Sequence, residues 1–387
     1  MNIVLFDNEK VKNFWPLTYN KPLAHLRTGI LTIEERWKFK TKEKVSVYSF
    51  SEENNLQDVN LEDDLIWVDS SIIIYGDILE KILSLESNSF LMDEVGFIAG
   101  RSKFSVIPKS IQSLYKSFSQ KIEIKNSKRL EYPWQIFQWA DRTINEDFTI
   151  VAEGKYSQKI PESTIVFGSN SIFIEEGASL ECCYLNATNG PIYIGKEATI
   201  MEGSVVRGPF ALCDNATLKM GSKVYGATSL GPYCVGGGEI KNVIMMGYSN
   251  KAHEGYLGDS IIGEWCNLGA GTSCSNVKNT GGEIKLKDNT TNEQVIVGQK
   301  CGVIMGDYSR TAINTSINSG TTIGICCNVF GEGLLPKNIE NFTWGATEKK
   351  SYEFEKALAD INNWKAMKHL EITKQEVETL KFIYNNY

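Results

Sequence analysis

An aliphatic residue recurs at every sixth position through a long central stretch of this chain. A second register, four residues after each aliphatic, is small except at Phe210. A period of six fits neither an α-helix nor a long two-sided strand, but it is typical of a hexapeptide β-helix, in which short strands alternate with tight turns. We therefore expect a solenoid in which the aliphatic row fills the interior and the small residues fit the corners. The aliphatic row comprises Ile194, Ile200, Val206, Leu212, Leu218, Val224 and Leu230.

The same frame resumes further along the chain, so the solenoid is expected to continue to about residue 330. The two stretches that break the frame are residues 236–256 and 275–294. We expect both to be loops. Because loops carry function more often than regular coils do, the breaks are the places to look for a site, whereas the regular coils are expected to be a scaffold. The resumed frame is carried by Ile262 and Leu268, by Val297 and Val303, and by Ile317, Ile323 and Val329.

The residues before the solenoid have a different pattern, in which apolar strand-like runs alternate with helix-like ones, as in an α/β domain. The last forty or so residues are charged, and apolar side chains from Phe354 to Leu370 recur at helical spacing. We expect an α/β domain over residues 1–150, the β-helix over 160–346 and a C-terminal helical extension over 347–387. Within the first domain the expected strands are 3–6, 45–50 and a pair within 87–107; the expected helices are 30–39 and 132–148, and 72–83 is expected to run from strand into helix.

Composition sets limits on the class of protein. With 387 residues and 42% hydrophobic content, the chain can bury a large core. It contains no apolar run of membrane-spanning length and no signal-peptide pattern at its start, so we expect a cytoplasmic protein without a membrane segment. A net charge of −7 gives no basic field for nucleic acid. Cysteines at the small corner positions, namely Cys234, Cys266, Cys301 and Cys327, are expected to be buried as small apolar groups.

His253 is one of three histidines and lies in the first break of the solenoid frame. A hexapeptide carbonic anhydrase is excluded, because its zinc needs three imidazoles and His253 is the single histidine within the solenoid. Lys241, Lys251, Tyr256 and Asn267 flank His253, and this grouping suits an anionic sugar together with a base. A neutral imidazole can take a proton from an attacking amine near pH 7. The grouping by itself favours a catalytic and a structural histidine equally.

The spacing of these residues is that of a known family. Glu239-Ile240-Lys241 is followed by His253, then by Tyr256-Leu257-Gly258-Asp259, and then by the segment Asn-Leu-Gly-Ala-Gly-Thr at 267–272. This order resembles the left-handed β-helix acetyltransferase domain of the bifunctional N-acetylglucosamine-1-phosphate uridylyltransferase/glucosamine-1-phosphate acetyltransferase family. The resemblance implies acetyl transfer from acetyl-CoA to the amine of glucosamine 1-phosphate by a homotrimer.

The resemblance also implies a role for each matching residue. His253 would be the general base for the amine, and Glu239 its orienting partner. Lys241 would hold the sugar phosphate, Tyr256 and Asn267 the sugar, and Asn276 matches a further active-site asparagine. The backbone amide of Ala270 would lie near the acetyl-CoA thioester. Two basic residues of the family pattern have alternative counterparts, which are Lys219 or Lys223 upstream and Lys278 or Lys285 downstream.

The first domain is similar to sugar nucleotidylyltransferases in two short segments. Residues 16–23 read PLTYNKPL, and Tyr75-Gly76-Asp77 resembles a strand-end aspartate that holds Mg²⁺; residues 5–12, however, lack the family's glycine-rich loop. The layout of residues 16–37 is similar to the variant of the family found in Bacteroidetes-type bacteria. The resemblance implies uridylyl transfer from UTP to N-acetylglucosamine 1-phosphate, with Lys21 and Arg27 neutralising phosphates and Asp77 holding Mg²⁺. The alternatives are an acetyltransferase with a degenerate first domain, and a non-catalytic scaffold that binds sugar phosphate or nucleotide.

Overall fold

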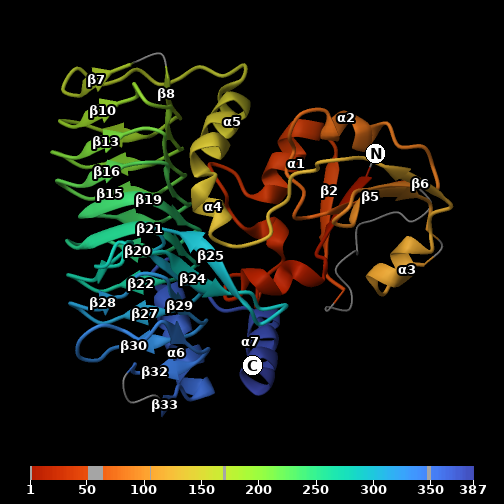
Figure 1. The fold of residues 1–387 in the computed structure, drawn as a ribbon. Coiled ribbons are helices and arrows are strands. Elements are labelled where there is room, and N and C mark those ends of the chain that lie inside the picture. Colours follow the sequence, from red (N-terminus) through yellow and green to blue (C-terminus); the bar gives the residue numbers. More distant parts are fainter. Residues whose placement is uncertain (1, 51–63, 105, 169–170, 347–349) are drawn as a thin grey trace. The chain divides into compact units, whose positions relative to one another are not determined.

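The computed structural model describes residues 2–50, 64–104, 106–168, 171–346 and 350–387 (Figure 1). The chain divides into two compact units. The first unit comprises residues 1–14, 21–26 and 31–132, and the second unit comprises residues 15–20, 27–30 and 133–387. The chain segment at 133–150, which the sequence grouped with the α/β domain, is thus part of the second unit, as are two short pieces of the N-terminal region.

The first unit is built on a six-stranded sheet of mixed direction. Strand β1 (Asn2–Phe6) is parallel to β2 (Lys44–Tyr48) and to β3 (Leu65–Asp69). Strand β5 (Phe97–Ser102) is antiparallel to β3 and to β4 (Ser89–Met92), and β6 (Gln120–Glu123) is parallel to β4. The helices are α1 (Ile33–Thr41), α2 (Ile78–Leu83) and α3 (Ile111–Tyr115), with 3-10 turns at Glu9–Phe14 and Leu23–His25. The expected α/β fold is confirmed.

The prediction that residues 72–83 run from strand into helix is half wrong. Helix α2 is present, but the strand of this region is β3, and Ile72 makes only an isolated bridge with Arg129. The chain turns directly after β3, where the Ile72 amide donates to the Asp69 carbonyl at 3.0 Å. An apolar run shows burial, and burial without periodicity does not distinguish a strand from another buried segment.

The second unit begins with α4 (Gln135–Gln138) and α5 (Ala140–Ala152), which are followed by a parallel β-helix (Figure 1). Its strands stack in register from coil to coil. One sheet comprises β7 (Ile165–Phe167), β8 (Ile172–Ile174), β10 (Tyr184–Asn186), β11 (Ile192–Ile194), β13 (Val205–Arg207), β14 (Phe210–Leu212), β16 (Lys223–Tyr225), β17 (Thr228–Leu230), β19 (Glu239–Met245), β21 (Tyr256–Ile262), β26 (Val303–Met305), β29 (Thr321–Ile323) and β31 (Asn338–Ile339).

A second sheet of the β-helix consists of two-residue strands. It comprises β9 (Ser179–Leu180), β12 (Thr199–Ile200), β15 (Thr217–Leu218), β18 (Val235–Gly236), β20 (Asn250–Lys251), β22 (Asn267–Leu268), β27 (Arg310–Thr311), β30 (Asn328–Val329), β32 (Thr343–Trp344) and β33 (Lys350–Ser351). A further pair joins β23 (Ser273–Cys274) to β28 (Ser316–Ile317).

The aliphatic row lies inside the β-helix, as its period predicts. Ile194 pairs with Leu212, and Leu212 pairs with Leu230, so each regular coil takes eighteen residues. Every member of the row is at most 2% exposed. The four corner cysteines are buried and unpaired, which confirms that they act as small apolar groups. The hexapeptide β-helix is therefore confirmed.

The first break in the frame, residues 236–256, is not a loop, so that prediction is wrong. The chain continues through β18, β19 and β20 with its pairing intact, but Leu230 pairs with Met245, only fifteen residues further on. Strand β19 covers two rung positions, residues 239–241 and 243–245, and the corner between them is the single residue Asn242, whose φ is +55°. The frame is lost because the coil is shorter.

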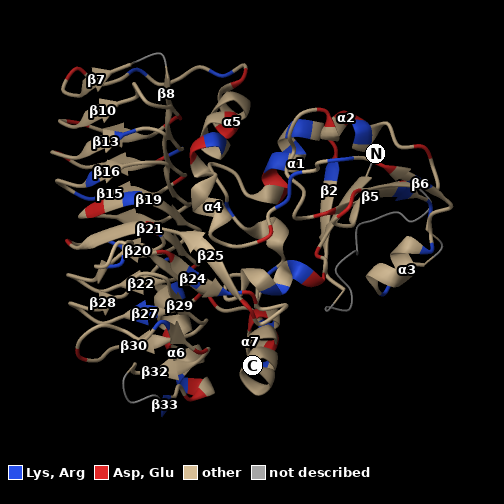
Figure 2. Ribbon diagram, viewed as in Figure 1, with Lys and Arg blue, Asp and Glu red and all other residues tan. Residues whose placement is uncertain are grey.

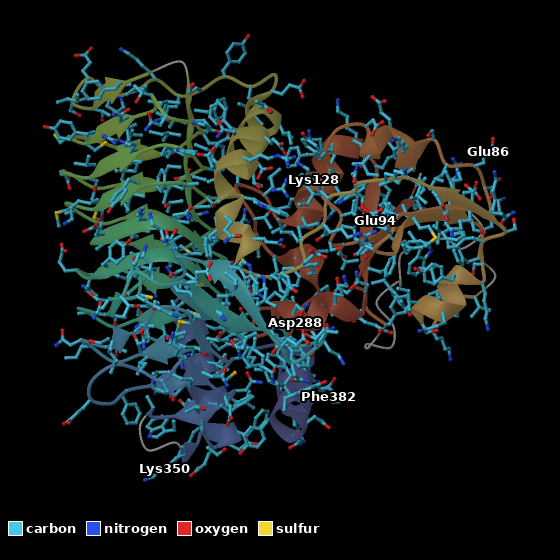
Figure 3. The ribbon with its side chains drawn as sticks, in the orientation of Figure 1. Glu86, Glu94, Lys128, Asp288, Lys350 and Phe382 are labelled. Atoms are coloured by element: carbon cyan, nitrogen blue, oxygen red, sulfur yellow. The ribbon has the colours of Figure 1, made fainter. Side chains whose placement is uncertain are left out.

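The second break, residues 275–294, is a true insertion. Strands β24 (Ile284–Lys287) and β25 (Gln294–Gly298) form an antiparallel hairpin, which moves the next coil away in sequence, since Ile262 pairs with Met305. Asp288, which is labelled in Figure 3, lies at the hairpin turn, where it accepts the amide hydrogens of Thr290 and Thr291. Val297 therefore belongs to the hairpin and not to the resumed frame, whereas Val303 does lie in the interior.

The C-terminal extension consists of two helices, α6 (Phe354–Ala366) and α7 (Lys374–Asn386). Ile361 is buried in a cluster with Trp265 and Tyr308 of the β-helix, as the apolar spacing predicts. The predicted stripe ends early, because Met367 lies beyond α6 and is 69% exposed. No helix in the described ranges combines the length and the apolar character needed to cross a membrane. Acidic and basic residues occur together on α1, α2 and α5 (Figure 2).

Candidate functional site

The His253 segment connects β20 to β21, and its imidazole is exposed. Two glycines of the coil below allow the segment to lie against that coil. A Cβ on Gly237 would be 2.4 Å from the carbonyl oxygen of Ala252. A Cβ on Gly238, where φ is +70°, would be 2.8 Å from the carbonyl oxygen of His253. Any larger residue would displace the histidine backbone.

The coil above holds the same segment from its other side. A Cβ on Gly255, where φ is +121°, would be 2.2 Å from the Thr272 carbonyl oxygen. The Gly271 amide donates to the Glu254 carbonyl at 3.0 Å, and the Glu239 amide donates to the Gly255 carbonyl at 3.2 Å. The three residues from His253 to Gly255 are therefore fixed between two coils, although they belong to no strand.

The residues expected to bind the sugar phosphate lie on neighbouring rungs. Glu239 pairs with Tyr256 across β19 and β21, and Lys241 pairs with Gly258. The Glu239 carboxylate bonds the hydroxyl of Tyr225, which donates to Glu239 Oε1 at 2.6 Å. This bond raises the pKa of Tyr225. Burial also raises it, but by less. Tyr225 belongs to this cluster although the sequence analysis missed it, and its only signal is its place one coil below Lys241.

The expected partnership of Glu239 with His253 is not visible as a hydrogen bond between these two described residues. Their connection runs through the backbone, since the Glu239 amide bonds the carbonyl of Gly255. The Tyr256 hydroxyl is half-buried, and burial together with the Asp259 carboxylate raises its pKa above the usual range. Tyr256 is thus a neutral hydroxyl that can donate and accept at the sugar.

Asn267, Ala270 and Asn276 lie on the coil above. Asn267 is partly buried in β22, where it pairs with Asn250. The Ala270 carbonyl accepts from the Asn314 amide at 2.7 Å, whereas the Ala270 amide donates to no acceptor among the described residues. Asn276 is 9% exposed and donates from Nδ2 to a carboxylate oxygen of Asp259. The Ala270 amide can therefore serve a bound ligand, while Asn276 is engaged with the protein.

The alternative basic residues differ in their surroundings. Lys223 lies 3.8 Å from the Glu254 carboxylate and is exposed, beside the His253 segment. The backbone of Lys219 bonds its neighbouring coils, since its amide donates to the Gly236 carbonyl and its carbonyl accepts from the hydroxyls of Ser204 and Ser222. On the hairpin side, Lys278 donates to the Glu283 carbonyl and Lys285 is exposed in β24. Of the upstream pair, Lys223 is the one in contact with the segment that carries the histidine.

The N-terminal motif residues Lys21 and Arg27 fall in different units. Arg27 is 6% exposed, and its guanidinium donates to the carbonyl of Ile30 within its own segment. This segment is docked on the β-helix, where the Ser229 hydroxyl donates to the Gly29 carbonyl at 2.7 Å and the Arg27 amide lies 3.3 Å from Met246 Sδ. The structure does not bring Arg27 and Lys21 together as one phosphate site within a unit.

Asp77 directly precedes α2 and is exposed. Its carboxylate forms an ion pair with Lys81 at 2.9 Å, and the hydrogen bond from Lys81 lowers its pKa. No three His, Cys, Asp or Glu side chains gather as a metal site in the part of the chain that is described. Asp77 does not line the pocket of the first unit.

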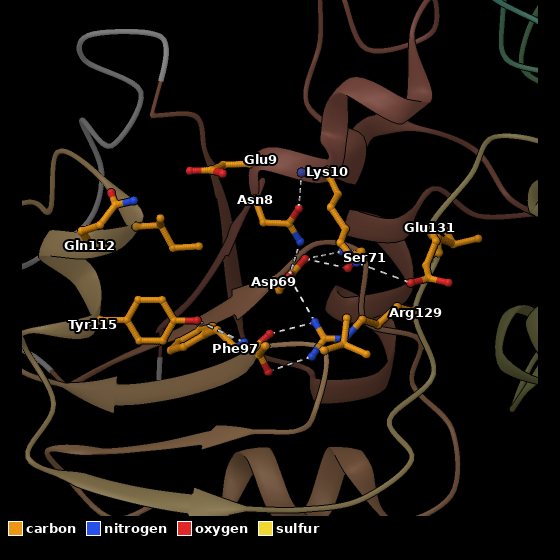
Figure 4. A pocket seen from close by; sticks show the side chains of 14 residues that line it. Asn8, Glu9, Lys10, Asp69, Ser71, Phe97, Gln112, Tyr115, Arg129 and Glu131 are labelled. Atoms are coloured by element: carbon orange, nitrogen blue, oxygen red, sulfur yellow. Dashed lines mark hydrogen bonds and ion pairs between the residues drawn. The ribbon is translucent and has the colours of Figure 1, made fainter. Parts of the chain in front are cut away.

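That pocket, of about 290 Å³, lies where β1 and β3 end (Figure 4). Asn8 follows β1, and its amide bonds the carboxylate of Asp69, the last residue of β3. Arg129 donates to Asp69 at 3.3 Å and to Asp93 at 2.8 Å, while the Ser71 hydroxyl bonds Asp69 at 2.7 Å. Burial raises the pKa of Asp69, against the opposing effect of Arg129. The pocket is lined by Asn8, Glu9, Lys10, Asp69, Ser71, Val95, Gly96, Phe97, Ile111, Gln112, Tyr115, Arg129, Leu130 and Glu131.

Asp7 directly follows β1 and interacts electrostatically with Asp69, although it does not itself line the pocket. Its Oδ2 accepts the Leu23 amide at 3.0 Å, whereas its Oδ1 is buried without a hydrogen-bond partner among the described residues. Burial raises the pKa of Asp7 to about 7. The sequence analysis missed Asp7, Asp69 and Arg129; the first two directly follow or end apolar strand segments, and Arg129 has no local signal.

Residues 3–156 match the sequence model of a family described as sugar nucleotidyl transferase. A relative named bifunctional protein GlmU, from Methanocaldococcus jannaschii, is 28% identical over 55% of this chain and 45% of its own length. A bifunctional sugar-1-phosphate nucleotidylyltransferase/acetyltransferase from Sulfurisphaera tokodaii is 25% identical over 52% of this chain and 47% of its own length. The resemblance to the bifunctional family is therefore confirmed. The chain spans less than half the length of these two relatives.

Among solved structures, the N-acyltransferase AntD from Bacillus cereus, in complex with dTDP and 3-hydroxybutyryl-CoA, is 11% identical. The alignment covers 53% of this chain and 91% of that chain, with a TM-score of 0.21. At that score the similarity carries no weight for the site.

Proposed function

We propose that the second unit transfers an acetyl group from acetyl-CoA to the amine of glucosamine 1-phosphate. The observation that carries the proposal is the His253 segment, which is exposed at its imidazole and fixed between two coils. The coil below supplies Glu239 and Lys241, and the coil above supplies Asn267 and the Ala270 amide. A base, a cation and polar groups thus flank one edge of the solenoid.

In the proposed reaction, neutral His253 accepts a proton as the amine nitrogen attacks the thioester carbonyl. The nitrogen–carbon bond forms and the carbon–sulfur bond breaks, and the proton held by the imidazole neutralises the departing thiolate. The Ala270 amide donates to the oxygen on which negative charge develops. Lys241 acts as a point charge for the sugar phosphate, while Tyr256 and Asn267 bond the sugar hydroxyls.

The test is thiol release from acetyl-CoA with glucosamine 1-phosphate, for the wild type and for His253→Ala. Removal of a general base is expected to lower kcat by roughly 100-fold or more. His369→Ala is the matched control, since His369 is exposed and lies in the C-terminal extension. A wild-type protein that is inert with this and other amino-sugar phosphates would overturn the proposal and favour a binding scaffold.

We further propose that the first unit transfers a uridylyl group from UTP to N-acetylglucosamine 1-phosphate. Support comes from the family match over residues 3–156 and from the pocket at the ends of parallel strands β1 and β3, where α/β sheets bind ligands. Lys21 stays a proposed phosphate contact. Arg27 is a weaker candidate than Lys21 for contacting a phosphate, because its guanidinium already bonds the Ile30 carbonyl.

A bound Mg²⁺ would neutralise phosphate charge. The buried, unpartnered Oδ1 of Asp7 fits a cation, whereas Asp77 would first have to release Lys81. Mg²⁺-dependent pyrophosphate release is the assay, with Asp7→Asn and Asp77→Asn compared side by side. No release with several nucleotide and sugar pairs would leave acetyl transfer as the only activity and the first unit as a degenerate domain.

A homotrimer in the cytoplasm is the assembly and location that we propose from the family resemblance. Light scattering measures the oligomeric state. A fully active monomer would contradict the trimer, because sites in this kind of transferase lie between adjacent β-helices.

A further inference from the structure

Lys251 occupies a position inside the β-helix that is otherwise aliphatic or small. In the second sheet, Ile200 pairs with Leu218, Leu218 with Gly236, and Gly236 with Lys251. The lysine is 1% exposed and is among the largest fully buried side chains of the protein. Its side chain therefore fills the interior of the solenoid.

The ammonium group of Lys251 binds only backbone oxygens. It donates to the Gly237 carbonyl at 3.2 Å and to the carbonyl of His253. No carboxylate among the described residues forms an ion pair with it, and the Glu254 carboxylate acts on it only at longer range. Both acceptors belong to the segments that the site brings together, the glycine run below and the histidine segment itself.

A buried cation held by neutral acceptors is costly, because desolvation disfavours the charged form. Burial lowers the pKa of Lys251 to about 8, against the opposing effect of Glu254. A leucine or methionine would fill the same row without this cost, as Leu218 does two rungs below. Packing alone therefore does not account for a lysine at this position.

We propose that Lys251 is the positioning residue of the His253 segment, and that its ammonium group holds the His253 carbonyl from inside the solenoid and so fixes where the imidazole lies. The glycines fix the segment by shape, since they only allow close approach. Lys251 adds a directed attraction on the histidine residue itself. The link to catalysis rests on the proposed acetyl transfer, whereas the holding of His253 does not depend on any activity.

The experiment compares Lys251→Met and Lys251→Leu with the wild type, with Leu218→Met as the control in the same interior row. The first readout is the ¹⁵N spectrum of protein labelled at histidine, which holds three such residues. Loss of the anchor is expected to shift and broaden the His253 signals, while those of His25 and His369 stay in place. The second readout is steady-state acetyl transfer, where kcat is expected to fall roughly 10- to 100-fold with KM within about twofold, because misplacing a base by about 1 Å is that costly.

Unchanged His253 signals in a folded Lys251 variant would overturn the proposal, as would a kcat equal to that of Leu218→Met. If neither apolar variant folds, Lys251 is required by the solenoid itself and the proposal is also wrong. A wild-type protein without acetyl transfer would sink the proposed function, but the spectral shift would still decide whether Lys251 holds His253.

Discussion

A buried cation lies at the candidate site of each unit, and the two cations differ in whether carboxylates bind them. In the first unit, Arg129 is 8% exposed and bonds two carboxylates, Asp69 and Asp93, in addition to the carbonyls of Phe97 and Gly96. In the second unit, Lys251 is 1% exposed and bonds two carbonyl oxygens. A planar guanidinium matches paired carboxylates, whereas a compact ammonium suits single acceptors.

The pKa shifts of Asp93 and Lys251 show how these partners affect the cost of burying a charge. Burial raises the pKa of Asp93, yet the hydrogen bonds from Ser127 and Arg129 outweigh it, so the net shift is downward. Lys251 has no such compensation, and its pKa falls. Arg129 thus compensates the burial of Asp93, while Lys251 retains a cost that stability alone does not explain.

The largest effect is expected from breaking the compensated cluster. Arg129→Met would leave Asp69 and Asp93 buried without their cation, and removal of one partner of a buried pair costs about 3–5 kcal/mol. Urea unfolding followed by hydrogen exchange in β1 and β3 measures the loss. Arg101→Met is the control, since its pair with Asp64 is partly exposed and should cost less than about 1 kcal/mol. Equal losses in the two variants would mean that burial does not set the strength of these pairs.

A smaller, pH-dependent difference in stability is expected between the wild type and Lys251→Met. The folded-state pKa is about 8, below the usual 10.5, so between these values the folded protein has lost a proton that the unfolded chain keeps. Wild-type stability relative to the variant should therefore rise by about 1–3 kcal/mol as the pH increases from 8 to 10.5. The midpoints of urea unfolding, measured for both proteins between pH 8 and pH 10.5, test this prediction. A constant difference would show that the lysine is not desolvated.

A comparable effect of opposite direction is expected at Asp7. Its folded-state pKa of about 7 exceeds the usual 3.8, so between these values the folded protein retains a proton that the unfolded chain has released. Wild-type stability relative to Asp7→Asn should fall by about 1–3 kcal/mol from pH 4 to pH 7. Adding Mg²⁺ should reduce this fall if the ion binds the carboxylate. A fall that is absent without Mg²⁺ would contradict the burial of Asp7.

The smallest effect concerns the hydroxyl that bonds Glu239. Tyr225→Phe removes a 2.6 Å hydrogen bond to a partly exposed carboxylate, so acetyl transfer should fall by about tenfold or less. Initial rates at saturating and at limiting glucosamine 1-phosphate would show whether the loss is in kcat or in KM. A loss as large as that of His253→Ala would mean that Tyr225 itself takes part in the reaction.

The solenoid could be predicted because its signal is local. Each interior aliphatic, such as Leu212, meets the same surroundings one coil later, so the period in the sequence is the period in space. The spacing of Glu239, His253 and Tyr256 was equally visible, since these residues follow one another along two coils. Their roles as catalyst and ligands stay predictions.

The surroundings of those residues could not be predicted, because they depend on contacts across coils or across the chain. The sequence showed a break at 236–256, but only the pairing of Leu230 with Met245 revealed a shortened coil. The motif at Arg27 resembled a phosphate site, yet that segment docks on Ser229, two hundred residues further along the chain.

The sequence by itself determined the β-helix, its buried corner cysteines, strands β1, β2, β4 and β5 of the first sheet and the order of the site residues, because period and alternation are properties of neighbours in the chain. Only the tertiary structure decided which charges are buried and what compensates them. Asp69 and Arg129 meet across sixty residues, and Lys251 is turned inward beneath His253 by the rung on which it falls. Burial and pairing are properties of the folded surroundings, and no local pattern records them.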